Sequence, residues 1–173
     1  PGHLNAIFIQ DANALNVYNK TTKEDGEKAL KVANDQGAFV FWNHPNWISN
    51  RDDGIARLDK FHKDLLKKKL FHGIEVVNEH TYSEEALAIA IENNLTIMGT
   101  SDVHGLIDWD YPKHKNAHRP ITFILSKNRT IKSIKDALFS QKTFVWFKDI
   151  IIGKKENLIP LLDKNIIING GGH

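Results

Sequence analysis

Residues 95–105 read LTIMGTSDVHG, an apolar run that leads directly into Asp102 and His104. The run is typical of a buried strand, and side chains two residues apart lie on the same side of an extended chain. A carboxylate and an imidazole are therefore presented together, and both are ligands that zinc, manganese and iron accept. The stretch predicts a metal-binding corner at a strand end. The alternative is a capped strand end with a structurally satisfied histidine.

Two further histidines stand next to apolar runs. FVFW at residues 39–42 leads into His44, whereas His3 precedes AIFI at residues 6–9. His3 therefore lies either in a loop that folds back or at the start of an antiparallel strand. Packed structural roles are the alternative for both residues. Together with Asp102 and His104, the two histidines indicate a metallohydrolase.

The order of segments predicts an α/β fold, because apolar runs alternate with segments of helical period. We expect βα units around a mostly parallel sheet, with functional groups at the carboxyl ends of the strands. The polar, aromatic stretch at residues 105–120 is long for a connection, which is typical of functional or mobile loops. The expected strands cover residues 6–10, 38–42, 73–77, 95–100, 121–125 and 143–147, and the expected helices cover residues 24–36, 55–69, 84–92 and 130–140.

Composition restricts the classes of function. The 173 residues, 41% of them hydrophobic, suffice for one domain with its own core. A net charge of +2 argues against a nucleic-acid partner, and no apolar stretch reaches the ~20 residues that span a bilayer. The absence of cysteine excludes disulfides and thiolate ligands. Because the chain begins abruptly at Pro1, we expect an N-terminally truncated chain, and cytoplasm and periplasm both stay open as compartments.

Several other polar residues are candidates for the site. Glu75 stands in an apolar strand, where a buried carboxylate needs a partner, and this predicts a role in orienting a metal ligand. Asn43 ends a strand and is expected to bind a substrate oxyanion. His118 and Arg119 precede the strand at 121–125, and the guanidinium fork matches a phosphate, with a simple surface arginine as the alternative. The histidines expected to serve packing or surface roles are His62 and His72.

At these residues the chain resembles the polymerase and histidinol phosphatase (PHP) superfamily of metal-dependent phosphoesterases. The motifs that carry the resemblance occur in the family's order: GHLNA at 2–6, WNHPNW at 42–47, GIEVVN at 73–78 and SDVHG at 101–105. Within the superfamily, residues 3–9, 44–47 and 118–120 resemble a bacterial phosphodiesterase subfamily. The resemblance covers residues 1–160 and leaves 161–173 as a tail.

The resemblance implies a distorted (βα)7 barrel, of which residues 1–160 form the C-terminal part without the first βα units. It implies up to three divalent transition metals (Zn, Mn or Fe) in the complete protein. Asp102 would bind the first metal, His3 and His44 the second, and His104 the third. The family's remaining ligands lie upstream of the printed sequence, so we expect no metal site to be complete within it.

The resemblance also implies a reaction. The metals make hydroxide available and neutralise charge on the phosphoryl oxygens of a small-molecule phosphate ester, a diester more readily than a monoester. The alternatives are a metal-dependent amidohydrolase on a related barrel and a truncated, non-catalytic domain; the oligomeric state stays open. The expected roles are Asp102 and His104 as catalytic residues, with His104 protonating the leaving alkoxide, and Arg119, His118 and Asn43 as substrate-binding residues.

Overall fold

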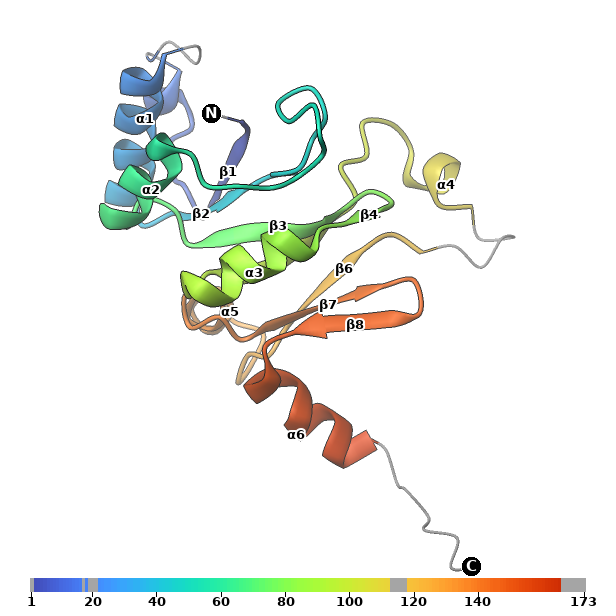
Figure 1. The fold of residues 1–173 in the computed structure, drawn as a ribbon. Coiled ribbons are helices and arrows are strands. Elements are labelled where there is room, and N and C mark those ends of the chain that lie inside the picture. The colour runs from blue at the N-terminus through green and yellow to red at the C-terminus, as the bar shows by residue number, and fades with distance from the viewer. Residues whose placement is uncertain (1, 17, 19–21, 113–117, 166–173) are drawn as a thin grey trace, which may run out of the picture.

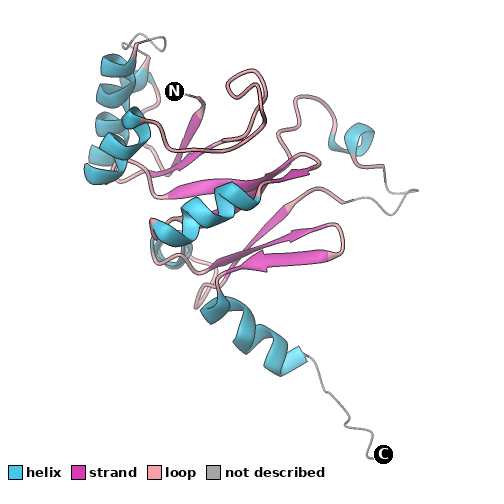
Figure 2. Ribbon diagram, in the orientation of Figure 1, coloured by secondary structure: helices cyan, strands magenta, loops and turns pink. Residues whose placement is uncertain are grey.

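The computed structural model describes residues 2–16, 18, 22–112 and 118–165, and it contains two β-sheets flanked by helices (Figures 1 and 2). None of the helices in these ranges is both long enough and apolar enough to cross a membrane. The elements in chain order are β1 (Leu4–Ile7), η1 (Asn13–Leu15), α1 (Lys23–Asp35), β2 (Phe39–Trp42), α2 (Lys60–Lys67), β3 (Gly73–Asn78), β4 (Thr81–Tyr82), α3 (Glu84–Glu92), β5 (Thr96–Thr100), α4 (Ile107–Asp110), β6 (Ile121–Ile124), α5 (Ile131–Phe139), β7 (Thr143–Phe147), β8 (Ile150–Gly153) and α6 (Lys155–Asn165).

The first sheet has β2, β3 and β5 as parallel neighbours, as the alternation of strands and helices predicts. β1 adds to β2 in the antiparallel direction, with Leu4 opposite Trp42. The start of β1 therefore lies beside the carboxyl end of β2. This geometry decides between the two alternatives for His3, because an antiparallel strand brings it to the same edge as His44. The short β4 turns back antiparallel to the end of β3.

The second sheet, β6-β7-β8, is antiparallel throughout, so the prediction of a mostly parallel sheet is wrong here. β6 and β7 are joined through α5, so no short turn sets their direction, whereas only two residues join Phe147 of β7 to Ile150 of β8. A connection of that length permits only an antiparallel hairpin, because a parallel crossover needs about a dozen residues or more. β8 itself was not expected from the sequence.

Threonine side chains join the two sheets, and a (βα)7 barrel is not confirmed. Thr122 Oγ1 accepts from the Gly99 N–H at 2.9 Å and donates to the Gly99 carbonyl at 2.8 Å. Thr143 Oγ1 donates to the carbonyl oxygen of Ile97 at 2.8 Å. These bonds take the place of a main-chain ladder between β5 and the second sheet. Gly99 is needed there because a Cβ would collide with Val145.

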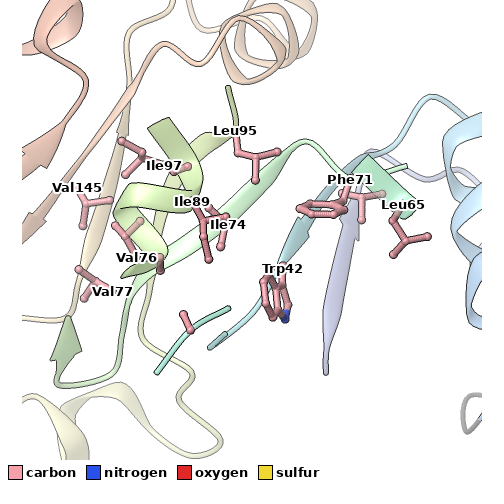
Figure 3. Packing of buried hydrophobic residues seen from close by; sticks show 14 of the residues in the cluster. Trp42, Leu65, Phe71, Ile74, Val76, Val77, Ile89, Leu95, Ile97 and Val145 are labelled. Carbon is pink, nitrogen blue, oxygen red and sulfur yellow. The ribbon is translucent and has the colours of Figure 1, made fainter. Parts of the chain in front are cut away.

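The main hydrophobic core lies between the first sheet and its helices and continues across this junction (Figure 3). Trp42, Leu65 and Phe71 gather where α2 leads into β3, and Val145 of β7 lies near Ile97 of β5. Figure 1 shows α1 and α2 beside β1 and β2, and α3 alongside β3. The helices thereby cover the strands and leave the strand ends free to carry polar residues.

Local sequence sets most helix boundaries. Thr22, Ser83 and Thr130 accept bonds from the first-turn N–H groups of α1, α3 and α5, as their positions predict. The predicted helix at 55–69 begins only at Lys60. Asp59 is its N-cap residue, and Arg51 binds the Asp59 carboxylate at 2.9 Å. α6 continues past residue 160 to Asn165, although the tail was expected to begin at residue 161.

Candidate functional site

The ends of the three parallel strands share an unusual backbone geometry. His44 follows β2 with a φ of 30°, Glu79 follows β3 with a φ of 50°, and Asp102 follows β5 with a φ of 49°. Residues other than glycine seldom adopt a positive φ, and those that do are concentrated at functional sites. The strand ends at which the sequence predicted a site are thus also the places where the backbone turns sharply.

His3 and His44 meet at this edge. The Asn43 N–H donates to the His3 carbonyl at 3.0 Å, which fixes the start of β1 beside the end of β2. Nδ1 of His3 then lies 3.1 Å from Nε2 of His44, with the two rings edge to face. The Trp47 ring packs against both, with its centroid 5.8 Å from that of His3 and 5.1 Å from that of His44. The structure therefore brings together the two histidines predicted to share a metal.

The spacing of the two nitrogens fits ligands of one ion. Two imidazole nitrogens at about 2.0–2.1 Å from a metal stand about 2.8–3.4 Å apart at octahedral to tetrahedral angles. His44 is only 9% exposed, and its Nδ1 has no hydrogen-bond partner among the described residues. Within the same residues, no group of three or more histidine, aspartate or glutamate side chains converges on one point. The pair thus offers two nitrogens to a metal ion, and a metal ion would need further ligands.

Glu75 holds the three strand ends in place. Its side chain is 1% exposed, and Oε2 accepts from the His44 N–H at 2.7 Å and from Asn78 Nδ2 at 2.9 Å. Oε1 accepts from Thr100 Oγ1 at 2.6 Å. Burial raises the pKa of Glu75, and the bonds from Thr100, His44 and Asn78 oppose that rise. The geometry matches the positioning role predicted for this carboxylate.

Asp102 lies between two cavities. It lines one of about 470 Å³ together with His3, His44 and Asn43. It also lines a second of about 440 Å³, in which His104 is found. The predicted metal residues are therefore divided, with the histidine pair on one side of Asp102 and His104 on the other.

Asn43 is 7% exposed, and its Oδ1 is buried without a partner among the described residues. An amide oxygen accepts hydrogen bonds, so it suits a water or hydroxyl donor rather than an oxyanion. Binding of a substrate oxyanion, as predicted, falls to its Nδ2. The position beside His3 and His44 is the one that the sequence indicated.

His118 and Arg119 lie elsewhere. The two ring nitrogens of His118 face the carbonyl oxygens of Arg119 at 2.8 Å and Lys148 at 3.1 Å. The ring also packs on Trp146, with the centroids 4.2 Å apart. The Arg119 side chain is exposed. Neither residue lines the two cavities that Asp102 separates.

Tyr111 was not expected at the site from the sequence. This residue is 5% exposed, lines the second cavity, and has a hydroxyl with no hydrogen-bond partner in the described ranges. Burial raises the pKa of the Tyr111 hydroxyl most, and the negative charges of Glu79, Asp110 and Asp102 raise it further. The available signal was an aromatic residue directly after Asp110 in the long loop after His104, and that pattern alone does not predict burial.

Comparison with known proteins gives one informative match. No protein-family model and no curated protein matches the chain. Among solved structures, it is similar to a two-domain protein from Bacteroides vulgatus ATCC 8482 that contains a predicted PHP-like metal-dependent phosphoesterase, with 40% sequence identity and a TM-score of 0.86. The match covers 95% of this chain and 46% of that protein, so the chain spans about half its length.

Proposed function

Because the chain belongs to the PHP superfamily of metal-dependent phosphoesterases, we propose that the protein hydrolyses phosphate esters with bound divalent metals, and diesters more readily than monoesters. The observation that supports this proposal most is the distance of 3.1 Å between His3 Nδ1 and His44 Nε2. The pair lies beside Asp102, at the carboxyl ends of parallel strands. Divalent metals bound here would supply an activated water and neutralise the charge of phosphoryl oxygens.

The residues around the pair have distinct roles in this proposal. Glu75 fixes the main chain of His44, and Asn43 offers its amide to a phosphoryl oxygen. Asp102 is the proposed metal ligand nearest the second cavity, and His104, which is exposed there, is proposed to protonate a leaving alkoxide instead of binding a metal. His118, with both nitrogens facing carbonyl oxygens, is better suited to bracing the β7–β8 turn than to binding substrate.

The preference for diesters has an electrostatic basis. Glu79, Asp102 and Asp110 line the second cavity, and no ion pair involving them occurs within the described residues. A monoester brings up to two negative charges to the site, whereas a diester brings one. Repulsion by Glu79 and Asp110, which are not proposed to bind a metal, therefore disfavours the monoester more strongly.

Matched chromogenic substrates test the proposal in the full-length protein. We expect the metal-loaded protein to hydrolyse bis(p-nitrophenyl) phosphate faster than p-nitrophenyl phosphate, and EDTA to abolish both activities. Hydrolysis of anilides or lactones, with both phosphate esters left intact, would identify an amidohydrolase instead. No hydrolysis of any of these compounds, in protein shown to carry metal, would favour the non-catalytic alternative.

A further inference from the structure

The cavity beyond Asp102 combines negative charge with aromatic surface. We call it the acidic aromatic cavity; its lining includes Glu79, His80, Asp102, Trp109, Asp110 and Tyr111. Lys148 reaches this edge of the molecule, yet its Nζ points to the His80 carbonyl oxygen at 3.4 Å and forms no ion pair with a carboxylate in the described residues. The carboxylates thus leave a negative potential that attracts a cation.

The arrangement of the acids selects the kind of cation. Glu79, Asp102 and Asp110 surround a space of about 440 Å³, and no three metal-ligating side chains converge within the part of the chain that the structure describes. Apart from the metal proposed at Asp102, a further compact metal ion would need ligands at about 2–2.6 Å, which Glu79 and Asp110 alone do not provide. An organic cation, with its charge distributed over several atoms, fits a wide acidic space.

Aromatic rings supply the surface that such a cation prefers. Trp109 is 75% exposed and lines the cavity, and the rings of His80 and Tyr111 lie 5.1 Å apart between their centroids. A cationic nitrogen is attracted to the face of tryptophan and tyrosine, and quaternary ammonium groups are recognised in this way. Exposed Trp109 is costly to leave in water and gains contact when a ligand covers it.

Tyr111 provides an observation independent of charge. Its buried hydroxyl lacks a partner within the described residues, although its side chain lines the cavity. A buried hydroxyl without a partner is costly, and a ligand oxygen that accepts a hydrogen bond from it removes that cost. An ester oxygen on the alcohol side of a phosphodiester is such an acceptor.

We propose that the acidic aromatic cavity binds the alcohol portion of the substrate and selects an amino alcohol, in particular one with a quaternary ammonium group. The cationic nitrogen lies between Glu79 and Asp110 and against Trp109, while Tyr111 donates to the oxygen of the alcohol. The substrate class is then a phosphodiester of a cationic alcohol. This inference rests on the proposed phosphodiesterase function, but its binding step can be measured separately.

Two isosteric esters test the selection in the metal-loaded full-length protein: p-nitrophenyl phosphocholine and p-nitrophenyl 3,3-dimethylbutyl phosphate, in which carbon replaces the charged nitrogen. We expect kcat/KM to favour the choline ester by about tenfold or more, as one cation–π contact with nearby carboxylates provides. The double variant Glu79→Gln/Asp110→Asn should bring the ratio close to one. Tyr111→Phe should lower kcat/KM for both esters alike.

Asp108→Asn is the matched control, because Asp108 is an exposed carboxylate of α4 outside the lining of the cavity. It should leave both the ratio and the activity unchanged. Equal kcat/KM for the two esters in the wild-type protein would overturn the inference while leaving the phosphodiesterase proposal in place.

A binding measurement separates the two proposals completely. Choline should quench tryptophan fluorescence more than 3,3-dimethylbutanol at equal concentration, and Trp109→Phe should remove the difference. If choline binds in this way but neither ester is hydrolysed, the proposed function fails and the cation site stands. If choline and its carbon isostere quench equally, the cation site is wrong.

Discussion

The main-chain N–H of His44 donates a 2.7 Å hydrogen bond to Oε2 of Glu75, so a buried carboxylate of β3 fixes the end of β2 that carries a candidate metal ligand. The same carboxylate binds Thr100 at the end of β5. One side chain therefore links the ends of the three parallel strands by hydrogen bonds, at the edge where the site is proposed.

Replacing Glu75 tests this role. Glu75→Gln puts an amide N–H₂ where the carboxylate accepts bonds, so at least one of the donors from His44, Asn78 and Thr100 loses its acceptor. We expect the free energy of unfolding in urea to fall by about 1–3 kcal/mol. Glu84→Gln on the exposed start of α3 should change it by less than about 0.5 kcal/mol. Equal stability of the two variants would show that Glu75 does not hold the strand ends.

If His3 and His44 bind one metal ion together, replacing either histidine should remove that ion. His3→Ala and His44→Ala should each lower the metal content of the full-length protein by about one ion per chain, because both nitrogens are proposed to bind the same ion. The double variant should lose no more than either single variant. Elemental analysis of the purified proteins measures this directly. The exposed His80→Ala serves as the control, and unchanged metal content in all variants would remove the shared site.

The junction between the sheets predicts a steric effect at Gly99. Its added Cβ would lie 3.1 Å from Val145 Cγ2 and closer still to Cγ1. Gly99→Ala should therefore lower the free energy of unfolding by about 1–3 kcal/mol through overpacking. Val145→Ala in the same chain should recover part of that loss. Strict additivity of the two changes would contradict the close approach of β5 and β7.

The lowered pKa of His72 makes the stability of the fold depend on pH. Burial lowers its pKa from the ordinary value of 6.5, and Nδ1 accepts from the Val40 N–H at 3.1 Å, a bond that the protonated ring cannot accept. The unfolded chain then binds a proton more readily than the folded protein. Stability from this group is present above pH 6.5 and is lost as the pH falls below it, by up to about 1.4 kcal/mol per pH unit.

His72→Gln keeps an acceptor for Val40 but does not titrate, so its unfolding free energy should depend less steeply on pH below 6.5. Thermal or urea unfolding at several pH values measures the slope. The control His80→Gln changes an exposed ring and should keep the wild-type slope. The same slope in the His72 variant and the wild type would contradict the account.

The sequence predicted the parts of the site that depend on local order. A strand followed by Asp102 and His104, and another followed by His44, place polar groups at strand ends whatever the rest of the fold does. The pattern of apolar runs could not predict strand direction, because β6 to β8 have the composition of parallel strands and pair antiparallel. Direction depends on connections and on partners far away in sequence.

The sequence also could not predict which groups each side chain contacts in the folded protein. His118 was predicted to bind substrate, but its ring nitrogens face two main-chain carbonyl oxygens. His62 stacks on Trp42 with the ring centroids 4.0 Å apart and is buried, a packing role that the sequence left open beside a surface one. The burial of Tyr111 depends on how the loop after His104 folds over the strand ends. Such contacts are properties of the tertiary structure and have no periodic signal.

The most direct test of the central claim is kcat/KM for bis(p-nitrophenyl) phosphate in the metal-loaded full-length protein and in two matched variants. Asp102→Asn alters the carboxylate between the two cavities, whereas Asp108→Asn alters an exposed one on α4. We predict that Asp102→Asn lowers kcat/KM by about 100-fold or more, as loss of a metal ligand does, and that Asp108→Asn leaves it within about twofold. Equal activity of the wild type and both variants, or no diester hydrolysis by the metal-loaded wild type, would contradict the account.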